Sequence, residues 1–260
     1  MELLSTWMPA LGISMLRPLG MMLMVPLMNP SVLGGTLIRN AVALAIALPA
    51  LAMYETWPLP QKSQLNGWSY LWLAATEIGI GVMIGFVAAI PFWALDMAGT
   101  LIDTMRGTAM ASVINPMIGQ ESSLLGILLT RLFGVLFLVT GGLNELIAAL
   151  YHSYATLPPG AAWQLQESFP VFFMRQWQLL YELCIRFAMP AMVAVLLVDM
   201  AFGLINRSAP QMNVFFLSMP VKSAFAIFML IVSLAYALQA PTDWSLRLVE
   251  YWYELAEHLR

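Results

Sequence analysis

Residues that could perform catalytic chemistry are few in this chain, and their spacing fits no catalytic motif. There are two histidines, His152 and His258, and one cysteine, Cys184. A metal-dependent or serine hydrolase would need a His-Glu-x-x-His or Gly-x-Ser-x-Gly arrangement, and the sequence contains neither. We interpret His152 as an interfacial residue and Cys184 as a small buried hydrophobe without a disulfide partner. We therefore expect no enzyme, no metal and no cofactor.

A second group of polar residues is unusual because it lies inside long apolar runs. An ionisable side chain that faces lipid is costly, and it normally marks a protein contact or an aqueous path. The residues are Arg17, Glu77, Arg131, Glu145, Glu182, Arg186 and Asp199. Glu182 and Arg186 stand at i,i+4 and can pair with each other. We take the rest to indicate that much of the surface faces other subunits.

The elements that carry these residues are predicted to be membrane-type helices. Hydrophobic residues make up 61% of the 260-residue chain and charged residues 10%, against about 25% charged residues in a soluble domain. About six apolar segments approach the length needed to cross a bilayer as helices. They are residues 8–28, 41–57, 68–95, 124–151, 179–205 and 218–239. No sequence repeat is found, so we expect one all-α domain over residues 1–260. The net charge of −3 excludes a basic surface for nucleic acid.

The third segment carries a face of small residues. Glu77, Gly81 and Gly85 recur every four residues, so they lie on one side of a helix, and the glycines form a small-xxx-small contact. Packing within the monomer and contact with a partner both stay open for this face.

A polar stripe follows the third segment. After Pro91 we expect the helix to continue, which places Asp96, Gly99, Asp103 and Arg106 on one side at i, i+3, i+7 and i+10. Asp103 and Arg106 can pair at this spacing. We favour a stripe that faces a water-filled conduit or a charged subunit, and a solvated helix face is the alternative.

The stretch over residues 107–121 is too polar to span a membrane and too apolar for a freely solvated loop. Irregular backbone between membrane helices is tolerated where protein buries it or where it lines a cavity. The composition suits a re-entrant or pore-occluding loop, and an ordinary surface loop is the alternative. The residues that we assign to this loop are Gly107, Met110, Ser112, Ile114, Asn115, Pro116, Met117 and Gly119.

The turn between the last two apolar segments, residues 206–222, also has a specific composition. Most turns between membrane helices are compositionally loose, whereas this one combines prolines, amides and basic residues in close order. We predict a contact with another subunit. The residues are Arg207, Pro210, Gln211, Met212, Asn213, Pro220 and Lys222.

The end of the chain, residues 241–260, reads as an amphipathic helical tail. Its acidic residues outnumber its basic ones, so an anionic membrane surface is a poor target. We expect a protein partner to cover its apolar face, and packing on the chain's own helices is the alternative. That face is formed by Trp244, Leu248, Tyr251, Trp252, Leu255 and Leu259.

Several of these motifs, in this order, resemble the export-gate family of bacterial type III secretion. That family includes FliR of the flagellum and SctT, also called SpaR, of virulence injectisomes. The resemblance spans nearly the whole chain. Its strongest part is Arg207-x-Ala209-Pro210-Gln211-Met212-Asn213 followed by Pro220-Val221-Lys222-Ser223. It also includes Pro91-Phe92-Trp93, Gly99-x-x-Ile102-Asp103-x-x-Arg106-Gly107, Asn115-Pro116 and Gly141-Gly142-Leu143.

The resemblance implies a structural role in the bacterial inner membrane, within the basal body of a secretion system. Members of the family assemble with P-type and Q-type export proteins into a helical rod around a conduit for unfolded secreted polypeptides. Other export-apparatus membrane components lie beside them. In the family, the loop that corresponds to residues 107–121 plugs the closed channel, and the turn at 211–213 lies at the channel entrance.

Phe92-Trp93, Asp103 and Arg106-Gly107 resemble the injectisome branch more than the flagellar branch. A flagellar counterpart is the first alternative. A secondary transporter is the second, because buried charges and broken helices also occur in transporters. No internal symmetry between the two halves of the chain supports the transporter.

Overall fold

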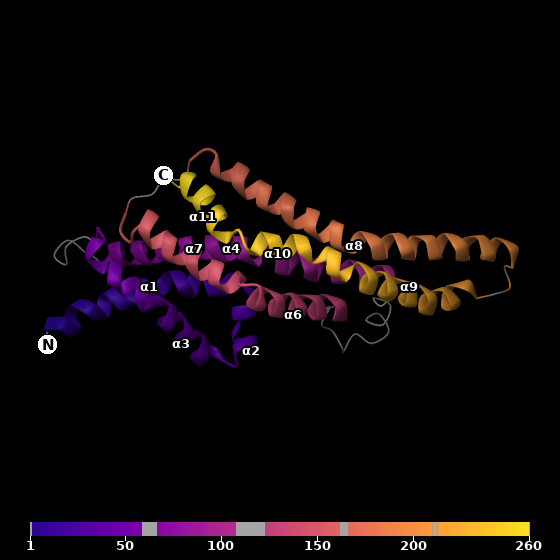
Figure 1. Cartoon of the computed structure of the whole chain (residues 1–260), viewed down its shortest axis with the longest axis horizontal. Helices are drawn as coiled ribbons and strands as arrows, with labels where there is room; N and C mark the ends of the chain where they lie inside the picture. The colour runs from indigo at the N-terminus through magenta and orange to yellow at the C-terminus, as the bar shows by residue number, and fades with distance from the viewer. Residues whose placement is uncertain are drawn as a thin grey trace. The chain divides into compact units, whose positions relative to one another are not determined.

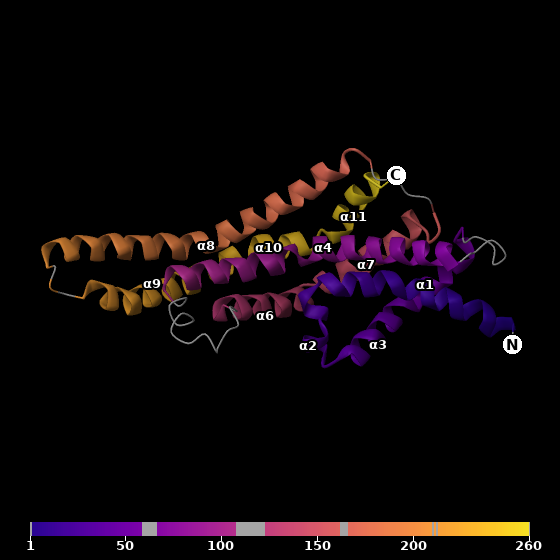
Figure 2. The ribbon, with the colours of Figure 1, turned by 180° about the vertical axis from the view of Figure 1, so that it is seen from behind.

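The described part of the chain is almost entirely helical (Figures 1 and 2). The computed structural model describes residues 2–58, 67–107, 123–161, 166–209, 211 and 213–259. The α-helices in chain order are α1 (Glu2–Met24), α2 (Pro30–Leu33), α3 (Thr36–Ala47), α4 (Gly67–Met105), α6 (Leu124–Val139), α7 (Gly142–Thr156), α8 (Phe169–Ser208), α9 (Val214–Ala237), α10 (Gln239–Ser245) and α11 (Leu248–Glu257). Two 3-10 helices are η1 (Pro26–Met28) and η2 (Pro49–Thr56). Over these ranges no strand occurs, so the predicted all-α class is confirmed.

Three stretches of the described chain are helical, long and apolar enough to cross a membrane: α4, α8 and Phe216–Ser245. α6 and α7 would make a fourth as one broken span, bent by 70° where Gly141 adopts a left-handed conformation with φ 95°. α3 is a shorter apolar helix and is followed by η2, which begins at a proline. α1 runs over 23 residues, of which Ala10–Met24 form a short apolar stretch. The expected number of about six long helices is therefore not confirmed. Helix continuation past Pro91 is confirmed, since α4 reaches Met105.

The chain packs as two compact units, each built from separate stretches of sequence. Unit 1 comprises Met1–Ile90, Phe137–Trp177 and Trp244–Arg260. Unit 2 comprises Pro91–Leu136 and Gln178–Asp243. α4 and α8 each contribute residues to both units. The assignment of residues 1–260 to a single domain stays a prediction.

In unit 1, α1 and α4 lie side by side with their backbones in direct contact. A Cβ added to Gly81 would lie 2.2 Å from the carbonyl oxygen of Arg17, and one on Gly85 would lie 2.4 Å from that of Met21. The reverse holds at Gly20 of α1, whose Cβ would lie 2.4 Å from the carbonyl oxygen of Ile78. Small residues on both helices permit this approach. The face predicted from Glu77, Gly81 and Gly85 thus packs inside this chain.

The same crossing buries an ion pair. Arg17 is 0% exposed, and its Nε donates to Oε2 of Glu77 at 2.5 Å while Nη2 donates to Oε1 at 3.1 Å. Its remaining donors reach the Ser153 hydroxyl at 3.1 Å and the Leu157 carbonyl at 2.5 Å. The guanidinium also lies 4.5 Å from the ring centre of Tyr154. A buried charge is tolerated only when its donors are paired, and this arrangement joins α1, α4 and α7.

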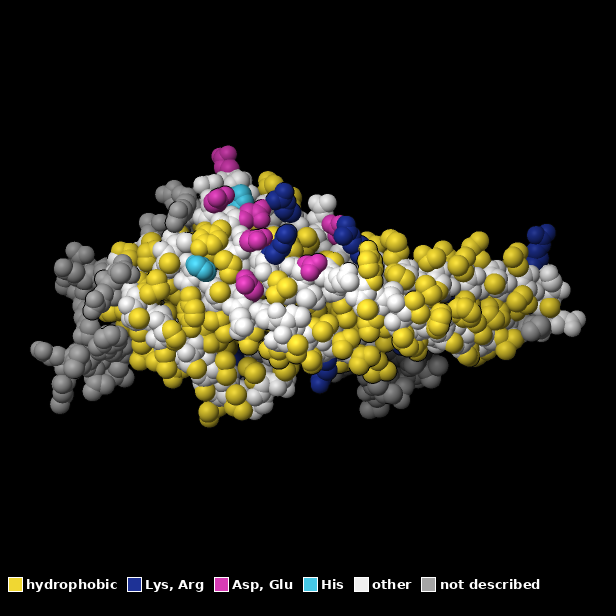
Figure 3. All heavy atoms as spheres, in the orientation of Figure 1, with side chains coloured by type: hydrophobic (Ala, Val, Ile, Leu, Met, Phe, Trp, Pro, Cys, Tyr) yellow, Lys and Arg dark blue, Asp and Glu magenta, His cyan; other side chains and the backbone are white. Residues whose placement is uncertain are grey.

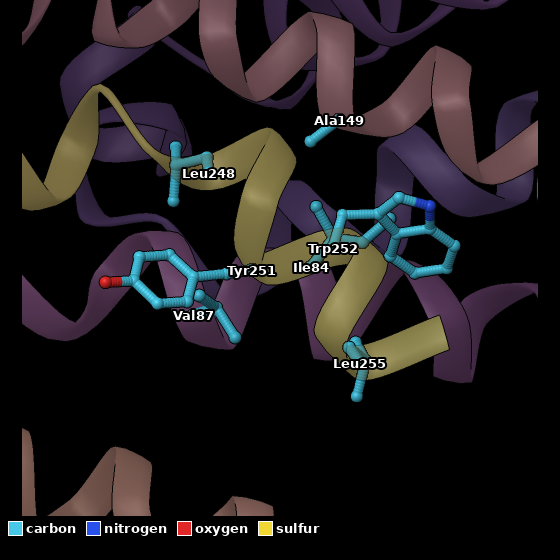
Figure 4. A pocket seen from close by; sticks show the side chains of 7 residues that line it. All are labelled: Ile84, Val87, Ala149, Leu248, Tyr251, Trp252 and Leu255. Carbon is cyan, nitrogen blue, oxygen red and sulfur yellow. The ribbon is translucent and has the colours of Figure 1, made fainter. Parts of the chain in front are cut away.

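The C-terminal helix α11 packs on unit 1 through its apolar face. Leu248, Trp252 and Leu255 are buried, and contacts to α7 dominate this helix. A cavity of ≈ 10 Å³ remains at this contact, room for about one water, so it is no ligand site. It is lined by Ile84, Val87, Ala149, Leu248, Tyr251, Trp252 and Leu255 (Figure 4). The expectation that a partner covers the apolar face of the tail is wrong, because the chain's own helices cover it.

Both histidines hold this C-terminal helix in place. Nδ1 of His152 lies 3.0 Å from the hydroxyl of Tyr253, and Nδ1 of His258 lies 2.8 Å from the hydroxyl of Ser168. The backbone amide of Gln166 also donates to the carbonyl of His258 at 3.1 Å. Each imidazole therefore has a structural contact between segments that are distant in sequence.

Unit 2 leaves much of its apolar surface uncovered. In the most apolar windows of α8 and of Phe216–Ser245, only 28% and 11% of the residues are buried. Figure 3 shows hydrophobic side chains over most of the visible surface of α8 and α9 in this unit, whereas charged side chains gather over α11 in unit 1. α8 and α9 also flank a cleft of ≈ 480 Å³, lined by apolar residues such as Val193, Leu197, Phe225 and Phe228.

The glycine crossing gives a matched test. Gly81→Ala should lower the free energy of unfolding by about 1–3 kcal/mol, because the methyl group forces α1 and α4 apart. Gly79 lies on the same helix with nothing within 4 Å of an added Cβ. Gly79→Ala should therefore be neutral or stabilising, by up to about 1 kcal/mol. Thermal unfolding of the two purified variants in detergent measures the difference, and equal stabilities would contradict the crossing.

Candidate functional site

The predicted polar stripe of Asp96, Gly99, Asp103 and Arg106 lies where α4 meets α6 in unit 2. The two helices meet at Gly99, where an added Cβ would lie 2.3 Å from the backbone nitrogen of Gly126. On the other side of the contact, a Cβ on Gly126 would lie 2.6 Å from Oδ1 of Asp96. Only glycine fits at these two positions. The end of α4 and the start of α6 are therefore in direct contact, although a long stretch of sequence separates them.

Asp103 ties this junction together. Its carboxylate accepts hydrogen bonds from Nε of Arg106 at 2.8 Å, from the hydroxyl of Ser123 at 2.5 Å and from the backbone amide of Leu125 at 3.1 Å. Asp103 is 6% exposed, and the side chain of Arg106 is 11% exposed. This half of the polar stripe is thus directed at α6 of the same chain. Asp96, in contrast, is exposed at the residue level.

The predicted plug loop lies almost entirely outside the described residues. Of its assigned members, only Gly107 is described. Its φ of 90° is left-handed, and an added Cβ would lie 3.5 Å from Cε of Met219 in α9. The other assigned members, from Met110 to Gly119, remain predictions. The described chain resumes at Ser123.

The turn between α8 and α9 exposes its polar residues. Arg207, Gln211 and Asn213 are exposed, as is Pro220. Asn213 precedes α9, but its side chain makes no capping hydrogen bond. Pro210 and Met212 lie outside the described residues. Side chains that serve neither the core nor a helix cap are available to another molecule, so the assignment of this turn to a subunit contact stays a prediction.

Lys222 differs from the rest of this group because it points at α8. Its Nζ forms an ion pair with Asp199, and its side chain is 17% exposed against 43% for Asp199. This accounts for one of the charges that the sequence places in an apolar run. Glu182 and Arg186 form a second pair at 2.5 Å, as predicted from their spacing, but both are well exposed.

Sequence reasoning missed one residue and one pairing that the structure shows to matter. Ser123 is the N-cap of α6, since its hydroxyl accepts a hydrogen bond from the amide of Gly126 at 2.9 Å. A serine directly before an apolar run is a recognisable signal for such a cap. The partnership of Arg17 with Glu77 was also missed. No local signal could have revealed it, because the two residues are 60 positions apart.

The described residues contain no group of three or more His, Cys, Asp or Glu that could hold a metal ion. The described residues form an all-α, membrane-type protein with two close helix crossings and buried ion pairs. Its polar clusters hold helices together.

Comparisons with known proteins identify the family. The family described as bacterial export proteins, family 1, matches residues 8–245. The secretion system apparatus protein SsaT of Salmonella typhimurium is 42% identical over 89% of both chains. The Yop proteins translocation protein T of Yersinia pestis is 34% identical over 86% of both chains. The flagellar biosynthetic protein FliR of Bacillus subtilis is 29% identical over 72% of both chains.

The chain belongs to the bacterial export proteins, family 1. The family resemblance drawn from the sequence motifs is thereby confirmed. Identity to the secretion and translocation proteins exceeds identity to the flagellar protein, which supports the injectisome branch.

The ion pair between α8 and α9 gives a second test. In a double-mutant cycle of Asp199→Asn and Lys222→Gln, we expect a coupling energy of about 1 kcal/mol, because Lys222 is largely buried. The same cycle on Glu182 and Arg186 should give at most about 0.5 kcal/mol, since both are solvated. Thermal unfolding supplies both values. A larger coupling for the exposed pair would show that burial does not set the strength of these contacts.

Proposed function

We propose that this chain is a structural subunit of the core export gate of a bacterial type III secretion system, on the injectisome branch, and not an enzyme. It lies in the inner membrane within the basal body. There it assembles with P-type and Q-type export proteins and with other export-apparatus components, around a channel for unfolded secreted polypeptides. The observation that carries the proposal is the family match, which extends over residues 8–245.

The uncovered surface of unit 2 supports assembly with other proteins. Most of the apolar surface of α8 and α9 is exposed, and a surface of this kind must be covered by lipid or by protein. Ion pairs sit within it, at Glu182–Arg186 and at Lys222–Asp199. Lipid disfavours charged groups even when they are paired. Partner helices that carry small or polar residues are therefore the better cover.

The finer part of the proposal concerns residues 107–121, which we infer to plug the channel at rest. Small side chains allow close approach, and Asn115-Pro116 prevents a helix from continuing. The helices that precede and follow the segment are in contact at Gly99 and Gly126. A segment whose two flanking helices are in contact is not needed to connect distant parts of the chain. This suits a role in sealing more than a role in joining subunits.

Shortening the loop tests the plug. Removing several residues within 112–119 should leave the complex with the P-type and Q-type partners intact and should raise leakage of a small dye from vesicles that contain it. The reason is that the neighbouring helices keep their contacts while the channel loses its filling. Thr104→Ala, an exposed change on α4, serves as the control. If the shortened complex is as tight as the wild type, the loop is only a connector.

The α8–α9 turn provides the test of partner contact. Gln211→Ala or Asn213→Ala should reduce secretion and weaken copurification with the Q-type protein, while membrane insertion is unchanged. Each amide that pairs in a buried contact is worth about 1–3 kcal/mol. Ser208→Ala is the control, because its exposed hydroxyl bonds only to Leu204 within α8 among the described contacts. Unchanged secretion and copurification in both variants would reduce this stretch to a simple turn.

A further inference from the structure

The carboxylate of Asp103 contacts the residue that follows α4 and the first residues of α6. Oδ1 accepts from Nε of Arg106, which lies one turn further along the same chain segment. Oδ2 accepts from the hydroxyl of Ser123 and from the backbone amide of Leu125, both at the start of α6. Oδ1 therefore contacts the residue just before the segment that joins α4 to α6, and Oδ2 contacts the residues just after it.

The position of Asp103 at the α6 terminus is favourable for a negative charge. The first amides of a helix lack partners within the helix, and the helix dipole makes this end positive. The hydroxyl of Ser123 accepts a hydrogen bond from the amide of Gly126. The carboxylate of Asp103 accepts one from the amide of Leu125 and one from the hydroxyl of Ser123. The N-terminus of α6 is thus capped by a residue 20 positions upstream as well as by its own N-cap.

This cap sits beside the glycine crossing. Gly99 is one turn before Asp103 on α4, and its backbone touches Gly126. The close backbone contact at the crossing brings the helices together, but it does not fix how each chain end leaves its helix. The carboxylate adds directional bonds at the last turn of α4 and the first turn of α6.

We propose that Asp103, Arg106, Ser123 and the Leu125 amide form a clasp that positions the two ends of the intervening segment. Asp103 is the positioning residue, and it acts through its contacts and not by touching cargo. The proposal rests on the plug function proposed above. Its consequence is that sealing depends on the clasp as well as on the composition of residues 107–121. Asp103 would then serve this chain itself and not a subunit contact.

The geometry predicts that an amide cannot replace the carboxylate. Arg106 and Leu125 both donate, so both side-chain oxygens at position 103 must accept. Asn offers one acceptor and one donor, so Asp103→Asn must lose one of the two contacts in either orientation. Ser123→Ala removes the hydroxyl from both Asp103 and Gly126. Ser123→Thr restores a hydroxyl at the N-cap.

The experiment compares these variants in the complete complex with its partners. Hydrogen exchange of the Leu125 and Gly126 amides should become roughly threefold to thirtyfold faster in Asp103→Asn and in Ser123→Ala. Dye leakage from vesicles should rise in the same two variants. Ser123→Thr and Thr104→Ala should match the wild type in both measurements. If Asp103→Asn does not assemble, Ser123→Ala decides with the same two readouts.

The outcomes separate the clasp from the plug. Unchanged exchange in both variants overturns the clasp, whatever the leakage. A second outcome is that exchange becomes faster in Asp103→Asn and Ser123→Ala but leakage stays at the wild-type level, while the loop-shortened variant leaks. That result overturns the clasp and supports the plug. If the loop-shortened variant is itself tight, the plug is wrong, and the clasp proposal falls with it.

Discussion

The buried charge on α4 is the constraint on which the arrangement of the other helices depends. Among the described residues the buried carboxylates are Glu77 and Asp103, and both belong to this helix. An unpaired carboxylate in such a place would cost several kcal/mol. Each must therefore be met by a particular partner, Arg17 in unit 1 and the α6 N-terminus in unit 2. The positions of α1 and α6 against α4 are therefore set by the need to bring these donors within hydrogen-bond distance.

Glycines allow the donors to reach both of these carboxylates. Side chains as short as Ser123 and groups as immobile as the Leu125 amide reach a carboxylate only when the two backbones nearly touch. Gly99 and Gly126 provide that approach in unit 2, and Gly81 provides it for Arg17 in unit 1. The same arrangement therefore occurs twice along α4. A glycine contact sets the distance between two helix backbones, and a carboxylate makes directional hydrogen bonds beside it. Packing alone is tolerant of small shifts, whereas a short hydrogen bond is not.

The sequence predicted the helices better than it predicted what they face. Apolar length indicates a helix wherever lipid or protein surrounds it, and that signal located α4, α8 and α9. It misjudged the segment over residues 41–57, because η2 follows the short α3 there. Periodicity placed Asp96 and Asp103 on one stripe, yet Asp96 is exposed and Asp103 is buried. A period states which residues share a side of a helix, but the partner on that side comes from a distant part of the chain.

The two units differ in how far they satisfy themselves. Unit 1 pairs its buried charge, covers the apolar face of α11 and uses both histidines in its own contacts. In unit 2 the α4–α6 junction has its polar groups paired, whereas the apolar faces of α8 and α9 are largely exposed. A chain built in this way can keep a fixed internal frame while its open faces gain stability from association. For a membrane protein of the export apparatus this division is physically sensible, because the frame must hold its shape while the open faces are covered by lipid or by other proteins.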